Sequence, residues 1–190
     1  MSKAERCPWA DVDDELMRAY HDCEWGTPLH DDRALFELLC LEGAQAGLSW
    51  RTVLHKREHY REAFHDFDIE RVARTSDATL EKLLRDPGLI RNRLKMTAIR
   101  CNARAALRLI DAHGSLDTAL WSLVGDKPMR NRWRSAGELP TQTQTSEQMS
   151  LALRKAGLRF VGPTICYAFM QASGMVNDHL LGCFRHAELA

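Results

Sequence analysis

Four residues near the two ends of the chain carry metal-binding side chains. His179 and Cys183 lie four positions apart, so both face the same way if the segment is a helix. Cys7 and His21 supply a second thiolate and imidazole. Together they form the Cys2His2 set of a structural zinc site, which would join the N- and C-terminal regions. The thirteen residues between Cys7 and His21 are not the ligand spacing of a zinc finger. The alternative to a zinc site is therefore that the cysteines are buried thiols and the histidines are hydrogen-bonded core residues.

A second pair of histidines suggests a different metal chemistry. His55 and His59 flank Glu58 in an H-x-x-E-H pattern, which is that of inverted zinc peptidases. The residues around them are heavily charged, as on a helix face in solvent. We therefore interpret residues 55–59 as part of a surface helix, with a peptidase as the distant alternative.

Aromatic residues gather in the first fifty positions, where Trp9, Tyr20, Trp25 and Trp50 lie on both sides of Glu42. A carboxylate near indole rings suits a planar ligand that is cationic or donates hydrogen bonds, such as a nucleobase. The same residue types also suit an aromatic core with Glu42 facing solvent. The sequence pattern alone leaves both interpretations open.

A short turn between two predicted helices could bind phosphate. The turn covers Leu158–Gly162, and Pro163 suits the first position of the second helix. Backbone amides at a helix N-terminus favour anions, so Phe160, Val161 and Gly162 are candidate DNA contacts. A turn between helices does not by itself establish DNA binding.

The elements that must position these residues are predicted to be helices. Helical spacing of apolar residues and capping signals mark their ends. The first predicted helix is capped by Asp31 and Asp32, breaks at Ala46–Gly47 and continues over 49–64. A short helix capped by Asp77 ends before Pro87, and a long one over 92–113 is stopped by Gly114. Two more follow: one begins with a capping box at Thr145–Gln148 and ends at Ala156–Gly157, and the other covers 163–173. No segment alternates as a strand does, and residues 125–145 are predicted to be a long loop. The fold class is therefore all-α.

Composition limits the class of protein. The chain has 190 residues, of which 45% are hydrophobic, and 26 basic residues balance 26 acidic ones. We expect one globular domain, with two helical lobes as an alternative, and the balance excludes a disordered tail. Six scattered cysteines in a chain of this length favour reduced thiols or a metal over a disulfide framework. No signal-peptide or membrane-spanning stretch is present, so we expect a cytoplasmic protein without membrane contact.

Charge is unevenly distributed despite the overall balance. Residues 1–48 hold eleven acidic and four basic residues, whereas residues 85–108 hold seven basic residues and the single acid Asp86. Either a polyanion binds this basic segment, with Arg91, Arg93 and Lys95 as phosphate contacts, or the segment is a solvated helix face.

Several strings, in the same order, resemble those of the DNA-3-methyladenine glycosylase I family, whose members are bacterial base-excision repair enzymes. The resemblance runs from Cys7 to about Cys183. The strings are Cys7-Pro-Trp9, Tyr20-His-Asp-Cys-Glu-Trp-Gly26, Leu41-Glu-Gly-Ala-Gln-Ala-Gly-Leu-Ser-Trp50, Phe160-Val-Gly-Pro-Thr-Ile-Cys-Tyr167 and Val176-Asn-Asp-His179.

The resemblance implies one glycosylase domain over 1–190 with a helix-hairpin-helix fold and its hairpin at about 158–162. It implies one structural zinc per chain, and a bacterial monomer that acts on double-stranded DNA containing alkylated bases. It also implies site residues: Glu42 for catalysis; Tyr20, Trp50, Trp9 and Trp25 for base binding; Gly47, Leu48, Phe160, Val161 and Gly162 for DNA binding; Cys7, His21, His179 and Cys183 for the metal.

Two positions bear on the implied mechanism. Thr164 stands where bifunctional relatives in the wider superfamily carry a Schiff-base lysine, so we expect no lyase step. Asn177 stands where the usual catalytic aspartate lies. We expect excision of 3-methyladenine by base flipping and hydrolysis, because a positively charged methylated base is already a good leaving group. Leu94 departs from the family pattern and could alter the start of the long helix; a non-catalytic DNA-binding module is the competing class.

Overall fold

Helices make up most of the chain. The computed structural model describes residues 5–10 and 12–189. Its α-helices are α1 (Glu15–Cys23), α2 (Asp32–Gln45), α3 (Trp50–Leu54), α4 (Arg57–Ala63), α5 (Ile69–Ala73), α6 (Asp77–Leu83), α7 (Arg93–His113), α8 (Leu116–Trp121), α9 (Gln144–Lys155), α10 (Pro163–Ala172) and α11 (Phe184–Glu188). The remaining elements are the 3-10 helices η1 (His65–Phe67), η2 (Ser122–Val124) and η3 (Ala136–Glu138) and the strands β1 (Met129–Arg130) and β2 (Val176–Asn177).

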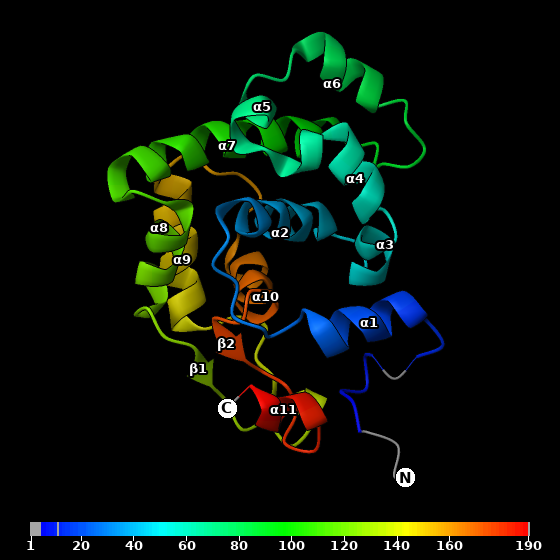
Figure 1. Ribbon diagram of the computed structural model, residues 1–190, viewed down its shortest axis with the longest axis vertical. Coiled ribbons are helices and arrows are strands. Elements are labelled where there is room, and N and C mark those ends of the chain that lie inside the picture. Colours follow the sequence, from blue (N-terminus) through cyan, green and yellow to red (C-terminus); the bar gives the residue numbers. More distant parts are fainter. Residues whose placement is uncertain (1–4, 11, 190) are drawn as a thin grey trace.

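The central element is α2. Every residue from 35 to 44 is buried, the acids Glu37 and Glu42 included, so other elements surround this mostly apolar helix. Asp31 caps its start by accepting a hydrogen bond from the Ala34 amide at 2.8 Å. Figure 1 shows α7 crossing above α2 and α10 below it, and α2 contacts both of them as well as α3 and α8.

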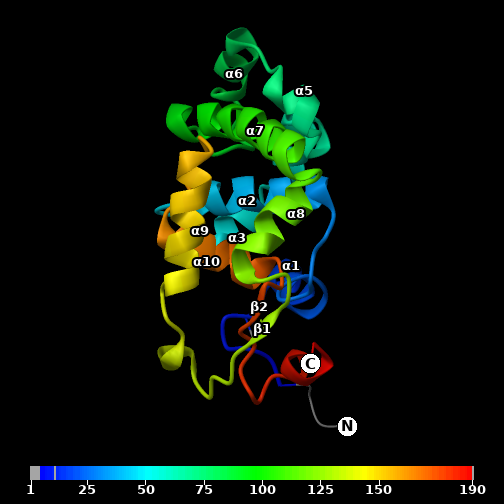
Figure 2. The same cartoon turned by 90° about the vertical axis from the view of Figure 1, so that its left-hand side faces the viewer.

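The other helices cover this centre. Figure 1 shows α8 and α9 along one side, whereas α4, α5 and α6 lie with α7 at the end opposite α11. The first described residues and α11 lie together at that other end in both views (Figures 1 and 2). Within the described part of the chain, no helix is both long and apolar enough to cross a membrane.

The predicted pair of helices around the turn is confirmed. Helix α9 packs against α10, and Pro163 is the first residue of α10. The amide of Leu158 donates to the Leu153 carbonyl at 2.9 Å, which closes the end of α9. The Ser150 hydroxyl donates to the Val161 carbonyl at 2.6 Å and holds the turn against α9. Backbone and side-chain contacts therefore define the shape of the turn.

Three predicted helix boundaries are wrong. The helix expected over 49–64 is two helices, because the amide of Lys56 turns back to Val53 and ends α3 before α4 begins. The predicted capping box at Thr145–Gln148 lies two residues too late, since Thr143 and Ser146 form it. Ser76, rather than Asp77, caps α6 with its hydroxyl. In the last two cases a neighbouring side chain is the better hydrogen-bond acceptor.

The expectation of no strands is also wrong. Strands β1 and β2 pair in parallel, with Met129 opposite Val176 and Arg130 opposite Asn177. Two residues are too few to show an alternating pattern, so no sequence signal marks them. The pairing joins the predicted loop over 125–145 to the segment before His179. That segment is irregular between β2 and α11, so the expected helical spacing of His179 and Cys183 is wrong as well.

Candidate active site and metal centre

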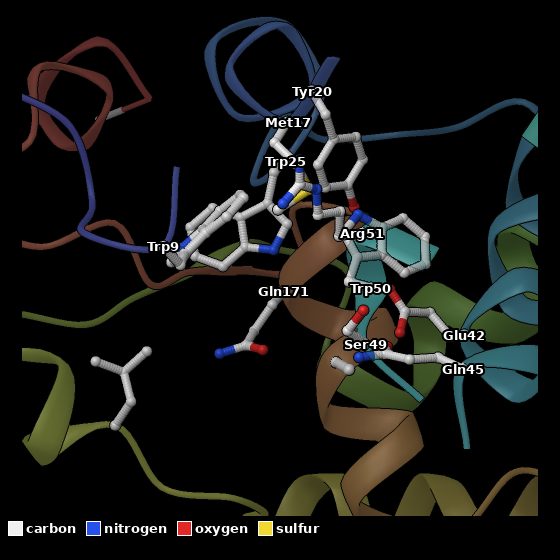
Figure 3. A pocket seen from close by; sticks show the side chains of 12 residues that line it. Trp9, Met17, Tyr20, Trp25, Glu42, Gln45, Ser49, Trp50, Arg51 and Gln171 are labelled. Carbon is white, nitrogen blue, oxygen red and sulfur yellow. The ribbon is translucent and has the colours of Figure 1, made fainter. Parts of the chain in front are cut away.

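A cavity of about 350 Å³ lies among α1, α2, α3 and α10. This volume is in the range of small-molecule sites. All five residues proposed from the sequence for catalysis or base binding line it, and Figure 3 shows most of the lining. The lining residues are Trp9, Met17, Tyr20, Trp25, Glu42, Gln45, Ser49, Trp50, Arg51, Leu139, Ala168 and Gln171.

Glu42 is the one acidic residue among these lining side chains. It lies near the end of α2, and its side chain is buried rather than facing solvent. Its Oε2 has no hydrogen-bond partner among the described residues. Burial raises the pKa of Glu42 from 4.5 to about 8, since removal from water disfavours the charged form. A buried carboxyl group without a partner is expensive, so it points to a ligand that would pair with it.

Two further polar groups next to Glu42 lack partners. The Tyr20 hydroxyl and the Trp50 Nε1 are both buried and have no hydrogen-bond partner in the described part of the chain. The two rings lie 5.2 Å apart with an angle of 41° between their planes. Burial, and then the nearby Glu42, raises the pKa of the Tyr20 hydroxyl. Figure 3 shows the Tyr20, Trp50 and Glu42 side chains converging on one side of the cavity.

The opposite side is formed by two indole rings. Trp9 and Trp25 meet edge to face with centroids 5.1 Å apart, and Trp9 lies 6.4 Å from the Tyr20 ring. Figure 3 shows Gln171 of α10 on the floor between the two groups of aromatic residues. The cavity therefore combines flat apolar walls with unpaired hydrogen-bonding groups. Such a site accepts a planar ligand that can donate hydrogen bonds or carry positive charge.

Some lining residues were not proposed from the sequence. Gln45 lies one helical turn after Glu42, so the spacing of α2 could have indicated it. Leu139 and Gln171 come from segments far along the chain, and nothing in the sequence places them here. Arg51 lies beside Trp50 at the start of α3 and pairs with Asp14 at 2.6 Å.

The His55–His59 pattern does not form a metal site. His55 lies between α3 and α4 and contacts Asp14 at 2.9 Å, and this bond lowers the pKa of Asp14 to about 2. Glu58 instead accepts a hydrogen bond from Arg61. The break between the two helices separates the histidines, so the structure does not support the peptidase hypothesis.

The residues proposed for DNA binding lie in two segments. After α2, Gly47 has a φ of +76°, which a side chain would strain, and Leu48 is 43% exposed. In the turn before α10, Val161 is buried, and its carbonyl accepts a hydrogen bond from the Ser150 hydroxyl. A Cβ on Gly43 would lie 3.2 Å from the Phe160 Cβ, so α2 touches this turn directly.

Of the three phosphate contacts expected on the basic segment, the one at Lys95 is wrong, and those at Arg91 and Arg93 stay predictions. Lys95 is buried, and its ammonium group donates to two backbone carbonyls. Arg93 pairs with Glu81, whereas Arg91 is exposed. Leu94 is 68% exposed in the first turn of α7 and leaves the start of that helix regular. Exposed bases gather instead around the turn before α10, at Arg154, Lys155 and Arg159.

The four proposed metal ligands meet in one buried cluster, Cys7, His21, His179 and Cys183, whose ligand atoms all lie within 4.8 Å of one another. The Cys183 sulfur lies 3.4 Å from His21 Nε2 and 3.5 Å from His179 Nδ1. The Cys7 sulfur lies 3.7 Å from His179 Nδ1. A tetrahedral zinc ion separates sulfur and nitrogen ligands by about 3.5 Å, so the cluster fits this ion.

The surroundings prepare the histidines to bind a metal. His21 Nδ1 lies 2.8 Å from the Asp22 carboxylate, and His179 Nε2 lies 2.9 Å from the Trp25 carbonyl. Because both partners are acceptors, these nitrogens carry the hydrogen, and the opposite nitrogens keep lone pairs that face the sulfurs. A hydrogen bond from Cys7 lowers the pKa of Cys183. The donor set thus fits a closed zinc site.

The side chains of Asn177 and Asp178 both form hydrogen bonds with other groups of the protein. The Asn177 amide donates to the His186 and Leu189 carbonyls, each at 3.3 Å. The Asp178 carboxylate is buried and accepts four hydrogen bonds, from Tyr167 at 2.5 Å, Asn131 at 2.7 Å, and Trp133 and Gln171 at 2.8 Å. Asp178 therefore joins α10 to the loop that carries Leu139, another lining residue of the cavity.

Replacing Asp178 with asparagine should destabilise the fold. The new amide would place an NH2 group against two of the four donors, so roughly 2–4 kcal/mol of stability should be lost. Urea unfolding followed by circular dichroism measures this loss. Asn131→Ala is the control, because it removes one donor and should lose about 1 kcal/mol. Equal stability of Asp178→Asn and the unsubstituted chain would contradict the importance of this network.

The fold and the cavity place this protein in a class: helical proteins with an aromatic cavity suited to a flat ligand that donates hydrogen bonds or carries positive charge. A sequence model described as methyladenine glycosylase matches residues 9–186. The chain is 50% identical over 179 residues to DNA-3-methyladenine glycosylase 1 of Escherichia coli (strain K12), covering 94% of this chain and 95% of that protein. A DNA-3-methyladenine glycosylase of Haemophilus influenzae is 46% identical over 178 residues, with coverage of 94% and 96%.

Solved structures are similar over the same range. A crystal structure of 3-methyladenine DNA glycosylase I is 50% identical, with a TM-score of 0.92, and covers 95% of this chain and 98% of that one. A structure concerned with 3-methyladenine recognition by the Staphylococcus aureus enzyme is 39% identical, with a TM-score of 0.89 and coverage of 91% and 92%. The chain belongs to the methyladenine glycosylase family, and the resemblance found in its sequence is confirmed.

Proposed function

We propose that this protein excises 3-methyladenine from alkylated double-stranded DNA. The observation that carries the proposal is the cavity in which Glu42, Tyr20 and Trp50 each hold a buried polar atom without a partner among the described residues. A methylated adenine would bring a flat ring, an amino group that donates hydrogen bonds and a positive charge. These properties match the aromatic walls, the unpaired Tyr20 hydroxyl and the Glu42 carboxyl group.

The damaged nucleotide would be turned out of the duplex into this cavity. Its base would stack against Trp50, with Trp9 and Trp25 on the far side, while Glu42 and Tyr20 bond to its edge. At neutral pH the empty cavity holds Glu42 in its protonated form, since its pKa is about 8. The cationic base favours the ionised form, so binding would release a proton.

Hydrolysis would then break the N-glycosidic bond. The base leaves as a neutral molecule with the bonding electron pair, water adds to the sugar carbon, and one proton is released. Asn177 bonds to backbone carbonyls and supplies no carboxylate, so the lability of the methylated base provides much of the rate. Thr164 cannot form a Schiff base, so we infer a hydrolase without lyase activity.

DNA would be held by two segments. Gly47 and Leu48 would fill the space left by the extruded nucleotide, and the backbone amides after Phe160 would bind a phosphate in a helix-hairpin-helix element formed by α9 and α10. The exposed Arg154 and Lys155 add positive charge beside that turn. We further infer that the chain acts as one domain and a monomer in the bacterial cytoplasm, with a zinc ion that is structural.

Release of the base tests the proposal. The full chain, incubated with methylated duplex DNA, should release 3-methyladenine, identified by chromatography, and leave abasic sites without strand breaks until alkali is added. Unmethylated DNA is the control and should release nothing. Binding of DNA without base release would indicate a non-catalytic module, and strand cleavage without alkali would contradict a purely hydrolytic reaction.

A further inference from the structure

We propose that Lys95 and Asn102 of α7 are positioning residues that hold the two DNA-binding segments at a fixed distance from each other. The inference rests on the proposed function, because it takes the loop after α2 and the turn before α10 to be the segments that engage DNA. Neither residue lines the cavity, so their action would be on the duplex rather than on the base.

Lys95 holds the end of α2. Its Nζ donates to the Ala44 carbonyl at 2.7 Å and to the Ala46 carbonyl at 2.6 Å. These carbonyls lie at the C-terminal end of the helix, where backbone acceptors lack partners and a cation is favoured. The ammonium group is buried, and burial lowers its pKa. The loop with Gly47 and Leu48 begins directly after the carbonyls that Lys95 holds.

Asn102 holds the turn before α10. Its Oδ1 accepts from the Arg159 amide at 2.8 Å, and its Nδ2 donates to the Arg159 carbonyl at 3.1 Å. One buried side chain thus satisfies both backbone groups of a single residue. The next residue, Phe160, has a φ of +56°, a conformation that non-glycine residues rarely adopt. Asn102 therefore fixes the backbone where the turn changes direction.

The two side chains share one face of one helix. Seven residues make two helical turns, so Lys95 and Asn102 lie nearly in line and about 10 Å apart along the axis. Figures 1 and 2 both show α7 beside α2 and beside the turn between α9 and α10. A small void where these three elements meet is lined by Gly43, Lys95, Asn102 and Phe160, among others.

A fixed spacing matters because both segments must engage the same duplex. If one segment shifts relative to the other, Leu48 cannot enter the gap while the turn holds its phosphate, and small misplacements reduce rates strongly. Helix α7 is regular, and it sets this spacing through the hydrogen bonds of Lys95 and Asn102 to backbone groups of the two segments. A loop of the same length would not hold the two segments so rigidly.

Lys95→Met is the direct test, because methionine keeps much of the length of the side chain and removes both hydrogen bonds. We expect single-turnover excision from duplex DNA, with enzyme in excess, to fall about tenfold. Binding of free 3-methyladenine, followed by tryptophan fluorescence, should stay within about twofold of the unsubstituted chain, since the cavity is unchanged. Lys82→Met, which removes an exposed lysine of α6, is the matched control for charge and should match the unsubstituted chain.

A double-mutant cycle with Leu48→Ala separates positioning from general weakening. In the Leu48→Ala background, Lys95→Met should add less than about a twofold further loss, because the segment that Lys95 positions is already impaired. A full additional tenfold loss would overturn the proposal. So would weaker binding of the free base in parallel with slower excision, because that pattern indicates a merely structural role.

Asn102→Asp decides the question if Lys95→Met does not fold. The aspartate still accepts from the Arg159 amide but cannot donate to its carbonyl, so duplex affinity should fall several-fold with free-base binding unchanged. If both variants excise like Lys82→Met, the inference fails while the proposed function stands. If the unsubstituted chain releases no base from methylated DNA, both fail.

Discussion

Replacing Glu42 with glutamine should slow the release of 3-methyladenine from duplex DNA by about ten- to a hundredfold. Glutamine keeps the shape of the side chain and removes its negative charge, and hydrogen bonds to charged groups contribute about 1.5–3 kcal/mol. Single-turnover excision with enzyme in excess measures the effect. Glu42→Ala should lose more activity, because it also empties part of the cavity.

The pH dependence follows from the same residue. The pKa of Glu42 is about 8 in the free protein, so the ionised form that complements a cationic base becomes more abundant as the pH rises through 8. We expect kcat/KM to rise with pH and level off above about 8. The Glu42→Gln variant should lack this rise. A flat profile for the unsubstituted chain, or a wild-type rate in Glu42→Gln, would contradict the role of Glu42.

As the pH rises, the stability of the fold should fall while the activity rises. In the unfolded chain Glu42 ionises near its ordinary value of 4.5, whereas in the folded chain it stays protonated until about pH 8. Folding is therefore penalised increasingly between these values, by an amount on the order of 4 kcal/mol at pH 8. Glu42→Gln should melt at a higher temperature than the unsubstituted chain at pH 8. The difference should shrink as the pH falls toward 4.5.

Asn177→Asp provides a contrast within the same protein. Restoring a carboxylate at this position should give little gain in excision, because the charged leaving group already lowers the barrier. The structure adds a reason, since the Asn177 amide donates to two carbonyls that an aspartate could not serve. A large gain in rate would show that the chemistry depends on protein charge at this position.

Local sequence signals predicted some elements of the fold well and others poorly. The long helix α7 was predictable because its apolar spacing extends over many turns and Asn92 and Gly114 mark its ends. Short helices such as α5 and α11 were missed because five residues carry too little periodicity. The break between α3 and α4 was missed because a backbone hydrogen bond from Lys56 to Val53 makes it, and no residue pattern marks that bond.

The residues of the candidate site, like the helices, were predictable from the sequence only in part. Residue types offered Glu42 and the aromatic residues as one of two interpretations, the family resemblance selected it, and the structure places these residues around one cavity. The role of Lys95 could not be predicted, because a lysine in a basic segment looks like a solvated charge until its carbonyl partners are known. Likewise Gln171 and Asp178 depend on long-range pairing that sequence spacing does not encode.

Removing the metal should destabilise the protein far more than it slows the chemistry. The four proposed ligands join Cys7 and His21 of α1 to the segment before α11, so a bound zinc ion would close the chain over nearly its whole length. We expect about one zinc per chain by elemental analysis. Cys183→Ala should lose about 4 kcal/mol, which for a chain of this size lowers the melting temperature by about 10 °C.

Cys40→Ala is the matched control for this metal prediction. Cys40 is also a buried thiol but lies outside the cluster, so its loss should leave the zinc content unchanged and cost only the small cavity that it creates. Below its melting temperature, Cys183→Ala should still excise 3-methyladenine within several-fold of the unsubstituted rate, because no ligand lines the base cavity. Protein purified without chelator that contains no zinc would refute the site. Loss of excision in a folded Cys183→Ala protein would contradict a role in stability alone and would show that the metal site positions the cavity, since the Trp25 carbonyl is bonded to His179.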